Sequence, residues 1–252
     1  MNKYLKFSLF LYYGLNFFAR CLLIDWRIRV EEKAIRAKTK MVSRLCRKGL
    51  RALDVHIQCV GLPAEAGGES RLYAANHQTY LDIFVLSACL ELQYVSAFEV
   101  AGDPTRAGIL KSAGVILVEN RRHDSRLANG VGQVAQTLEK NINVAVFPEG
   151  ETTNGTLKKF KPALFQAAVD AGRKVVPVSI RYTKVNGRHD PERIRDEVRW
   201  YDDRTSWYNH LINFCGFRSV EVVVHFHDEL PGAGRKELAQ ACEEVIREAV
   251  SG

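Results

Sequence analysis

A histidine and an aspartate five residues apart are the first residues whose types and spacing could do chemistry. His77 follows an apolar segment, residues 71–75, that we expect to be a strand, and Asp82 falls in the first turn of a helix expected over residues 81–90. A carboxylate bonded to one imidazole nitrogen fixes the tautomer, so the other nitrogen can take a proton from a hydroxyl. The pair therefore predicts a general base, as in a Ser-His-Asp triad with a substrate alcohol in place of the serine.

A second polar loop follows another expected strand, residues 143–147. It reads FPEGETTNG and places Glu149 between a proline and a glycine, followed by Thr152 and Thr153 and an Asn-Gly turn. Such a loop at a strand end offers hydroxyls and backbone N–H groups to a polar headgroup. Basic side chains that could pair with a phosphate come next: Lys158, Lys159 and Lys161.

Together these motifs resemble the 1-acyl-glycerol-3-phosphate acyltransferases, also called lysophosphatidate acyltransferases. The family pattern is NHxxxxD, a glycine-led strand ending in arginine, FPEG and a VPV-type strand, and it recurs here in the same order and spacing. The matching segments are residues 76–82, 114–121, 147–150 and 176–178. The resemblance implies O-acyl transfer from acyl-CoA or acyl-carrier protein to the free hydroxyl of 1-acyl-glycerol-3-phosphate, forming phosphatidate without a covalent acyl-enzyme.

The resemblance also implies roles for individual residues. His77 and Asp82 would be catalytic, and Glu149 would help to position the acceptor. Gly150 would permit close approach of the backbone, and Arg121 would contact the acceptor phosphate. The remaining candidates for substrate binding are Asn76, Thr152, Thr153 and Lys161. No metal and no cofactor are expected, because the acyl thioester is a co-substrate.

Three departures from the family pattern leave the acceptor headgroup open. The motif arginine aligns with Asn120, so Arg121 or Arg122 must replace it, and a shift of one residue on a strand points a side chain to the other face. Glu151 stands where threonine is usual and would repel an anionic headgroup, and Thr152 stands where an arginine is often found. Some family members with hydroxyl-rich FPEG loops also lack that arginine.

Two alternatives follow from these departures. The two glutamates of the loop would suit an amine-bearing acceptor, so the enzyme could act on another lysolipid such as a lyso-ornithine lipid or an aminolipid. A non-catalytic membrane-binding module that kept the fold is the second alternative, although His77 and Asp82 are both present.

Residues 1–53 indicate a membrane-associated helical segment. Residues 7–24 are apolar but contain Gly14, Asn16 and Arg20, so they are marginal for a span, which needs about 20 apolar residues. From Arg27 to Arg51, ten basic and two acidic residues sum to +8, against +7 for the whole chain. An apolar helix followed by a basic one suits an anionic membrane surface, either spanning it or lying in one leaflet.

Location and partners follow from the same features. The six cysteines form no CxxC pair and lie mostly in apolar runs, which is typical of a reducing compartment. We therefore expect the cytoplasmic face of the inner (plasma) membrane, with membrane lipids and an acyl-thioester donor such as acyl-carrier protein as partners. No nucleic-acid motif accompanies the basic segment, so nucleic acid is not expected.

Residues 54–252 predict an acyltransferase α/β domain. Strands are expected at 56–61, 71–75, 93–98, 115–119, 143–147, 174–182 and 220–226, and helices at 81–90, 104–113, 125–139, 162–171 and 235–250. Strands that alternate with helices indicate a mixed, largely parallel sheet flanked by helices. Between Tyr182 and Val220 the pattern weakens, and an aromatic-rich helical excursion near the membrane is one interpretation. His225 and His227 alternate in a strand and are expected on its polar face rather than in a metal site.

Overall fold

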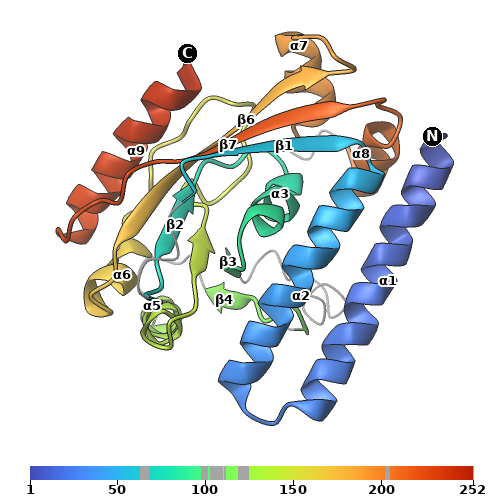
Figure 1. Ribbon diagram of the computed structural model, residues 1–252. Coiled ribbons are helices and arrows are strands. Elements are labelled where there is room, and N and C mark those ends of the chain that lie inside the picture. The colour runs from blue at the N-terminus through green and yellow to red at the C-terminus, as the bar shows by residue number, and fades with distance from the viewer. Residues whose placement is uncertain are drawn as a thin grey trace.

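The sheet has seven strands in a computed structural model that describes residues 1–62, 68–97, 102, 110, 112–118, 125–201 and 205–251 (Figure 1). The strands are β1 (Val55–Val60), β2 (Leu72–Ala75), β3 (Gln93–Ala97), β4 (Ile116–Val118), β5 (Val144–Val146), β6 (Val175–Val185) and β7 (Val220–Phe226). Their order is β1-β7-β6-β2-β5-β3-β4. From β6 to β4 all neighbours are parallel, whereas β7 is antiparallel to β6 and parallel to β1. The predicted mixed, largely parallel sheet is confirmed.

Helices cover both faces of this sheet. One face packs against α2 (Glu31–Ala52), α3 (Leu81–Cys89) and α8 (Trp207–Phe214), and the other against α5 (Ser125–Glu139), α6 (Phe165–Asp170) and α9 (Arg235–Ser251). Because side chains alternate along a strand, Tyr73 of β2 belongs to the first core and Leu72 to the second. Burial on both faces explains why β2 and β5 are continuous apolar runs without alternation.

Among the described elements, the largest differences from the predicted boundaries are three residues, at α6 and β6. α6 begins at Phe165 rather than residue 162, after a turn that contains Pro162. β6 continues to Val185, three residues beyond the predicted end. The stretch after it, where the sequence pattern weakens, contains α7 (Pro191–Arg193), a π-helical turn (Ile194–Val198) and α8. Its helical character is confirmed, and its position near the membrane stays a prediction. Most of the helix expected at 104–113 lies outside the described residues.

The N-terminal segment forms an antiparallel helical hairpin of α1 (Lys3–Arg27) and α2 (Figure 1). The ammonium group of Lys6 is buried and donates to the carbonyl oxygens of Leu53 (3.1 Å) and Phe217 (2.7 Å). It also pairs with Asp54 at 2.7 Å. These contacts fix one end of α1 to the sheet domain, and Lys38 of α2 fixes the other end by pairing with Asp25 at 2.8 Å.

The hairpin shares a core with the rest of the chain. Three buried residues at the end of α2 belong to the same cluster as α3 and the sheet face that packs against it: Cys46, Leu50 and Leu53. By length and composition, α1 is a candidate membrane span among the described residues. The division into two parts at residue 53 stays a prediction.

Candidate active site

The two polar loops meet because the strands before them are neighbours. β2 and β5 are parallel, with Ala74 opposite Val146, so both strands end at the same edge of the sheet. Thr153, in the loop after β5, reaches back to the carbonyl oxygen of His77 with its backbone N–H (2.9 Å) and its hydroxyl (3.2 Å). The topology thus brings together motifs that lie 70 residues apart.

The carboxylate of Asp82 is fully buried and receives four hydrogen bonds. Its Oδ2 lies 2.9 Å from His77 Nδ1 and accepts the backbone N–H groups of Gln78 (2.7 Å) and Thr79 (3.0 Å). Its Oδ1 accepts the hydroxyl of Tyr182 at 2.8 Å. Because backbone N–H groups can only donate, Asp82 Oδ2 is an acceptor here, and the hydrogen-bond network assigns the donor N–H of His77 to Nδ1.

The imidazole of His77 is held in one plane with its second nitrogen left as an acceptor. Since Nδ1 donates to Asp82, Nε2 has the lone pair that a general base needs. The ring of Phe147 stacks on the imidazole, with ring centroids 3.9 Å apart and planes at 14°. The side chain of His77 stays 14% exposed, so a substrate hydroxyl can reach it from outside.

Glu149 supports His77 from inside the protein. Its side chain is buried, and its two oxygens accept the backbone N–H groups of His77 (2.7 Å) and Lys158 (2.8 Å). Burial raises the pKa of this carboxyl above its usual value, and the two backbone donors oppose that rise. Both oxygens are therefore engaged within the chain, which removes the argument that this glutamate would attract an amine-bearing acceptor.

Asn76 and Gln78 extend the pairing of β2 with β6 past the end of β2. The side chain of Asn76 donates to the carbonyl oxygen of Ile180 (3.1 Å) and accepts its N–H (2.7 Å), and Gln78 Nε2 donates to the same oxygen at 3.1 Å. Asn76 is buried in these contacts, so it holds the backbone on either side of His77. A direct contact of Asn76 with substrate stays a prediction.

The other predicted binding residues surround the loop after β5. Gly150 has φ +80°, and a Cβ there would lie 2.5 Å from Nζ of Lys161, so the glycine leaves room for that exposed lysine. Thr152 is partly exposed, whereas Thr153 is buried and ties the loop to His77. Arg121 lies outside the described residues. The roles of all these residues in substrate binding stay predictions.

The comparison with known proteins decides the family. The acyltransferase family model matches residues 56–181, which include the His77–Asp82 pair and the FPEG loop. The 1-acyl-sn-glycerol-3-phosphate acyltransferase of Neisseria gonorrhoeae is 33% identical over 186 residues, covering 69% of this chain and 72% of that protein. The chain belongs to the acyltransferase family.

This acyltransferase resembles relatives with different named acceptors. The lyso-ornithine lipid O-acyltransferase of Pseudomonas aeruginosa is 32% identical over 214 residues, covering 84% of this chain and 77% of that protein. The crystal structure of the 1-acyl-sn-glycerophosphate acyltransferase of Thermotoga maritima has the same fold, with a TM-score of 0.67 and 19% identity. That alignment covers 100% of this chain and 97% of the other, so the likeness includes the N-terminal hairpin.

Sequence reasoning missed three side chains at the site of this acyltransferase. Tyr182 could have been found, because it follows Val178 and Ile180 at intervals of two on the buried face of β6. Phe147 was noted as part of a motif and not as a stacking partner of His77. Arg199, whose Nε donates to the side-chain oxygen of Gln78 at 2.8 Å, had no local signal, because it lies in the stretch where the periodic pattern weakens.

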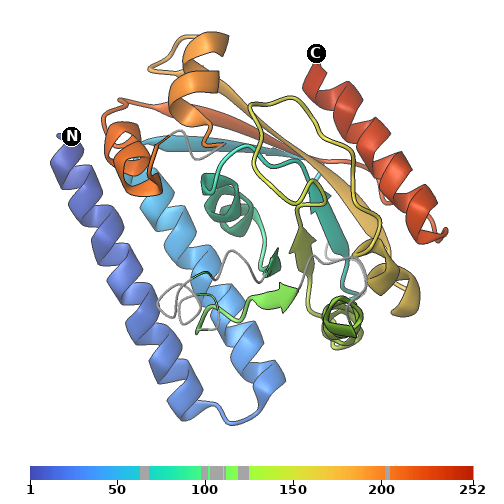
Figure 2. The ribbon, with the colours of Figure 1, turned by 180° about the vertical axis from the view of Figure 1, so that it is seen from behind.

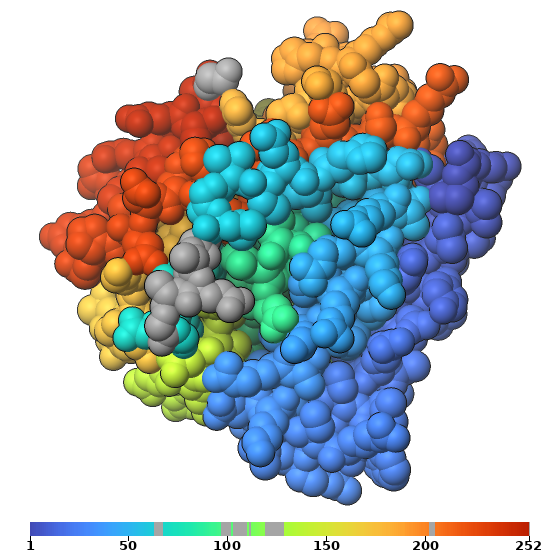
Figure 3. Space-filling view, in the orientation of Figure 1, coloured from blue at the N-terminus to red at the C-terminus, as the bar shows by residue number. Residues whose placement is uncertain are grey.

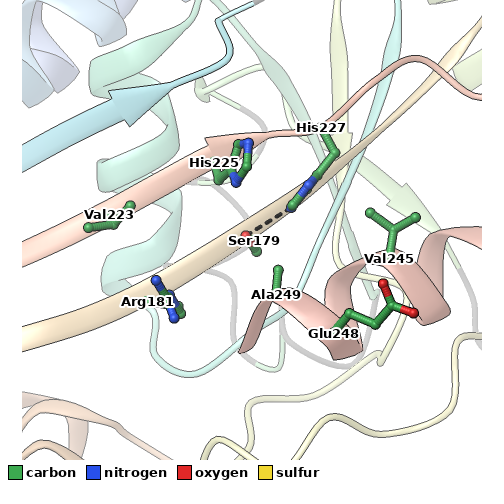
Figure 4. A pocket seen from close by; sticks show the side chains of 8 residues that line it. All are labelled: Ser179, Arg181, Val223, His225, His227, Val245, Glu248 and Ala249. Atoms are coloured by element: carbon green, nitrogen blue, oxygen red, sulfur yellow. Dashed lines mark hydrogen bonds between the residues drawn. The ribbon is translucent and has the colours of Figure 1, made fainter. Parts of the chain in front are cut away.

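A cavity of about 420 Å³ lies between β6, β7 and α9 (Figure 4), on the sheet face opposite to α3. It is lined by both His225 and His227, as their shared strand face predicts, and Ser179 bonds to His227 Nε2 at 3.0 Å. Burial lowers the pKa of His227 to about 4, so this imidazole is neutral at pH 7. Within the described residues, no group of three metal-ligating side chains is found, here or elsewhere.

Proposed function

We propose that this enzyme transfers a fatty acyl group from acyl-CoA or acyl-carrier protein to the free hydroxyl of 1-acyl-glycerol-3-phosphate, forming phosphatidate. The observation that carries the proposal is the His77–Asp82 pair, with a partly exposed His77 side chain beside the loop that contains Lys161. The names of the Neisseria and Thermotoga proteins support this acceptor.

The reaction needs one proton carrier and no covalent acyl-enzyme. His77 Nε2 removes the proton from the acceptor hydroxyl as its oxygen attacks the thioester carbonyl carbon. Asp82 stabilises the imidazolium that forms, as the aspartate of a catalytic triad does. The tetrahedral intermediate then expels the thiolate, the carbon–sulfur bond breaks, and the imidazolium returns the proton to the leaving sulfur. The ester product and the free thiol balance the reaction.

Two parallel stripes on the hairpin support docking on an anionic membrane. On α1, exposed apolar side chains recur on one helical face: Tyr4, Leu11, Leu15, Leu22 and Trp26. On α2, exposed basic side chains recur likewise: Lys33, Lys40, Arg44, Arg47 and Arg51. The first stripe suits the acyl region of a leaflet, and each basic residue near an anionic surface adds about 1 kcal/mol.

The contacts of α1 favour a position in the plane of one leaflet. The helix has 25 residues, hence a length of about 37 Å at 1.5 Å per residue. If it crossed the hydrocarbon core of about 30 Å, the basic stripe of α2 packed beside it would have to enter the core too, at high cost. Lying in the plane avoids this cost, and Figure 3 shows α1 and α2 side by side along one side of the molecule. The cytoplasmic leaflet, with its negative surface potential, fits the basic stripe.

A lyso-ornithine lipid is the second candidate acceptor. The similarity to the Pseudomonas protein over 84% of this chain favours it. Against it, Glu149 is engaged with backbone, and Glu151 pairs with Lys158 at 3.0 Å, so neither glutamate is a free charge for an amine.

The test is an acyl-transfer assay of the purified protein in vesicles. The donor carries a radiolabelled acyl group as a thioester on CoA or on acyl-carrier protein. Acceptors are lysophosphatidate and lyso-ornithine lipid, and Asp82→Asn is the inactive reference. We expect phosphatidate as the main product. Asp82-dependent acylation of the ornithine lipid with none of lysophosphatidate would establish the second candidate instead, and no Asp82-dependent transfer to either would refute both.

A further inference from the structure

Arg199 is a half-buried cation that reaches both polar loops of the site. Its Nε donates to the side-chain oxygen of Gln78 at 2.8 Å, and its Nη1 donates to the carbonyl oxygen of Asn154. The backbone is joined as well, because Trp200 N–H donates to the carbonyl oxygen of Gln78 at 3.0 Å. The guanidinium therefore bridges the residue that follows His77 and the loop that follows β5. Figure 2 shows the backbone of that loop in yellow.

Gly155 leaves the space beside the loop backbone that this guanidinium occupies. Gly155 has φ +102°, and a Cβ built there would collide with Nη1 and Cζ of Arg199. Gly150, in the same loop, makes room for Lys161 in the same way. Two glycines in left-handed conformation thus each leave space for a basic side chain, and Arg199 comes from a segment more than 40 residues further along the chain.

The partners of Arg199 within the described residues are neutral. Both of its hydrogen bonds go to amide oxygens, and among the described side chains none forms an ion pair with it. Burial lowers the pKa of the guanidinium below its usual value, and the negative charge of Asp82 opposes that change, so the group stays charged. By contrast, Lys158 in the loop pairs with Glu151.

A guanidinium in this setting is preorganised for an anion. Two of its nitrogens are fixed by neutral oxygens, so its plane is set while its positive charge is not neutralised by a carboxylate. Half-burial strengthens its electrostatic interactions compared with a fully solvated arginine. The acceptor phosphate is an anion that must come close to His77, because the hydroxyl it activates belongs to the same small molecule.

We propose that Arg199 binds the phosphate of the lysophosphatidate acceptor and selects it against acceptors without phosphate. Within the FPEG loop, Thr152 stands where relatives often have an arginine. Arg199 supplies the missing positive charge from outside that loop. This inference rests on the proposed function, and it adds the residue that sets the headgroup preference.

The test compares two acceptors that differ only in the phosphate, lysophosphatidate and 1-monoacylglycerol, in the same vesicles. For Arg199→Gln we expect kcat/KM for lysophosphatidate to fall about ten- to hundredfold, mainly through KM, because a charge-assisted hydrogen bond is lost. Activity on monoacylglycerol and KM for the acyl donor should change less than threefold. Arg195→Gln, in the same segment but exposed and paired with Asp196, is the matched control and should leave both acceptors unaffected.

A rescue variant separates binding from a structural role. Thr152→Arg, added to Arg199→Gln, returns a guanidinium to the loop by another route and should restore at least a third of the lost preference. Equal losses on both acceptors without rescue, or a rise in donor KM instead of acceptor KM, would overturn the assignment of Arg199. If the wild-type enzyme does not measurably use monoacylglycerol, the change in KM for lysophosphatidate and the rescue by Thr152→Arg test the assignment of Arg199. If wild type acylates neither acceptor, the proposed function itself fails.

Discussion

At the scale of single residues, most of the side chains around His77 support it rather than face a substrate. Asp82 fixes the ring through Nδ1, Phe147 stacks on one side, and Glu149 holds the backbone N–H of His77. Asp82 itself is fixed by Tyr182. A base that is already oriented loses little freedom when the reaction begins, which is the physical advantage of such a shell of contacts.

His77→Ala should lower kcat by a factor of about a thousand or more, because the general base is lost and its buried partner has nothing to orient. The measurement is the initial rate of acyl transfer with the acceptor concentration varied and the acyl donor saturating. His225→Ala, on the other face of the sheet, is the control and should retain wild-type turnover. A His77 variant that kept more than about a tenth of the activity would show that another group is the base.

Tyr182→Phe should lower kcat about two- to tenfold with little change in KM, since one hydrogen bond to Asp82 of about 0.5–1.5 kcal/mol is lost. Burial raises the pKa of Tyr182 well above its usual value, with the charge of Asp82 adding to the rise, so its hydroxyl stays a donor at neutral pH. The control is Tyr73→Phe, a buried tyrosine of β2 outside this network. Equal effects of the two substitutions would mean that the bond to Asp82 does not tune the site.

At the scale of elements, α8 connects the site to the hairpin. His210 of α8 is buried and shares a hydrogen bond of 2.9 Å between its Nδ1 and the hydroxyl of Tyr80, close behind His77. Tyr208 of the same helix meets Phe7 of α1 edge to face, with ring centroids 5.4 Å apart. α8 therefore contacts both the residues that precede the catalytic helix α3 and the helix expected to meet lipid.

Stability should depend on pH through His210. Burial lowers its pKa from 6.5 to about 4, so the unfolded chain binds a proton more readily than the folded one. The resulting stability is fully present above pH 6.5 and is lost as pH falls toward 4, at up to about 1.4 kcal/mol per pH unit for one proton. Urea unfolding at pH 7.5 and 5.0 should show a smaller difference for His210→Gln than for wild type. The exposed His189→Gln is the control, and an unchanged difference in the His210 variant would contradict the assignment.

The elements near the site differ in how far the sequence predicts them. The two strand–loop motifs around His77 and FPEG were predictable, because each combines an apolar run with residues that end a strand. In the stretch 186–215 the helical character was predictable but the individual elements were not, since α7 and the π-helical turn are short and carry no full amphipathic period. Arg199 follows that turn, so its approach to the site depends on tertiary contacts alone.

At the scale of the whole molecule, the sheet places the residues of the candidate active site, and we propose that the α1–α2 hairpin places the protein on the membrane. The site forms at the sheet edge where the parallel strands β2 and β5 both end, and this edge brings together two motifs that are distant in sequence. The buried Lys6 ties α1 to Leu53, Asp54 and Phe217, so the helix that we propose to meet lipid is anchored to the sheet. Deleting the N-terminal helix would therefore disturb the fold as well as membrane binding, and substitutions on its exposed stripe are the cleaner probe.

Replacing Leu11, Leu15 and Leu22 together by Gln should weaken vesicle binding at least a hundredfold. Each leucine buried in lipid contributes about 1.5–3 kcal/mol, whereas their exposure in the protein means that folding is little affected. Co-sedimentation with anionic vesicles measures the change, and circular dichroism confirms the fold. Val169→Gln, an exposed apolar residue on α6, is the control. Undiminished sedimentation of the triple variant would refute docking through this stripe.

The sequence by itself determined the chemistry, the family resemblance and the order of strands and helices, because each depends on residues close together in the chain. His77 and Asp82 are separated by one turn, and the apolar and basic runs of residues 1–53 are local patterns. Only the tertiary structure decided which groups are free to act. It engaged Glu149 with backbone, paired Glu151 with Lys158, fixed α1 along the domain and brought Arg199 to the loop. These outcomes depend on contacts between distant segments, which no local pattern of residue types encodes.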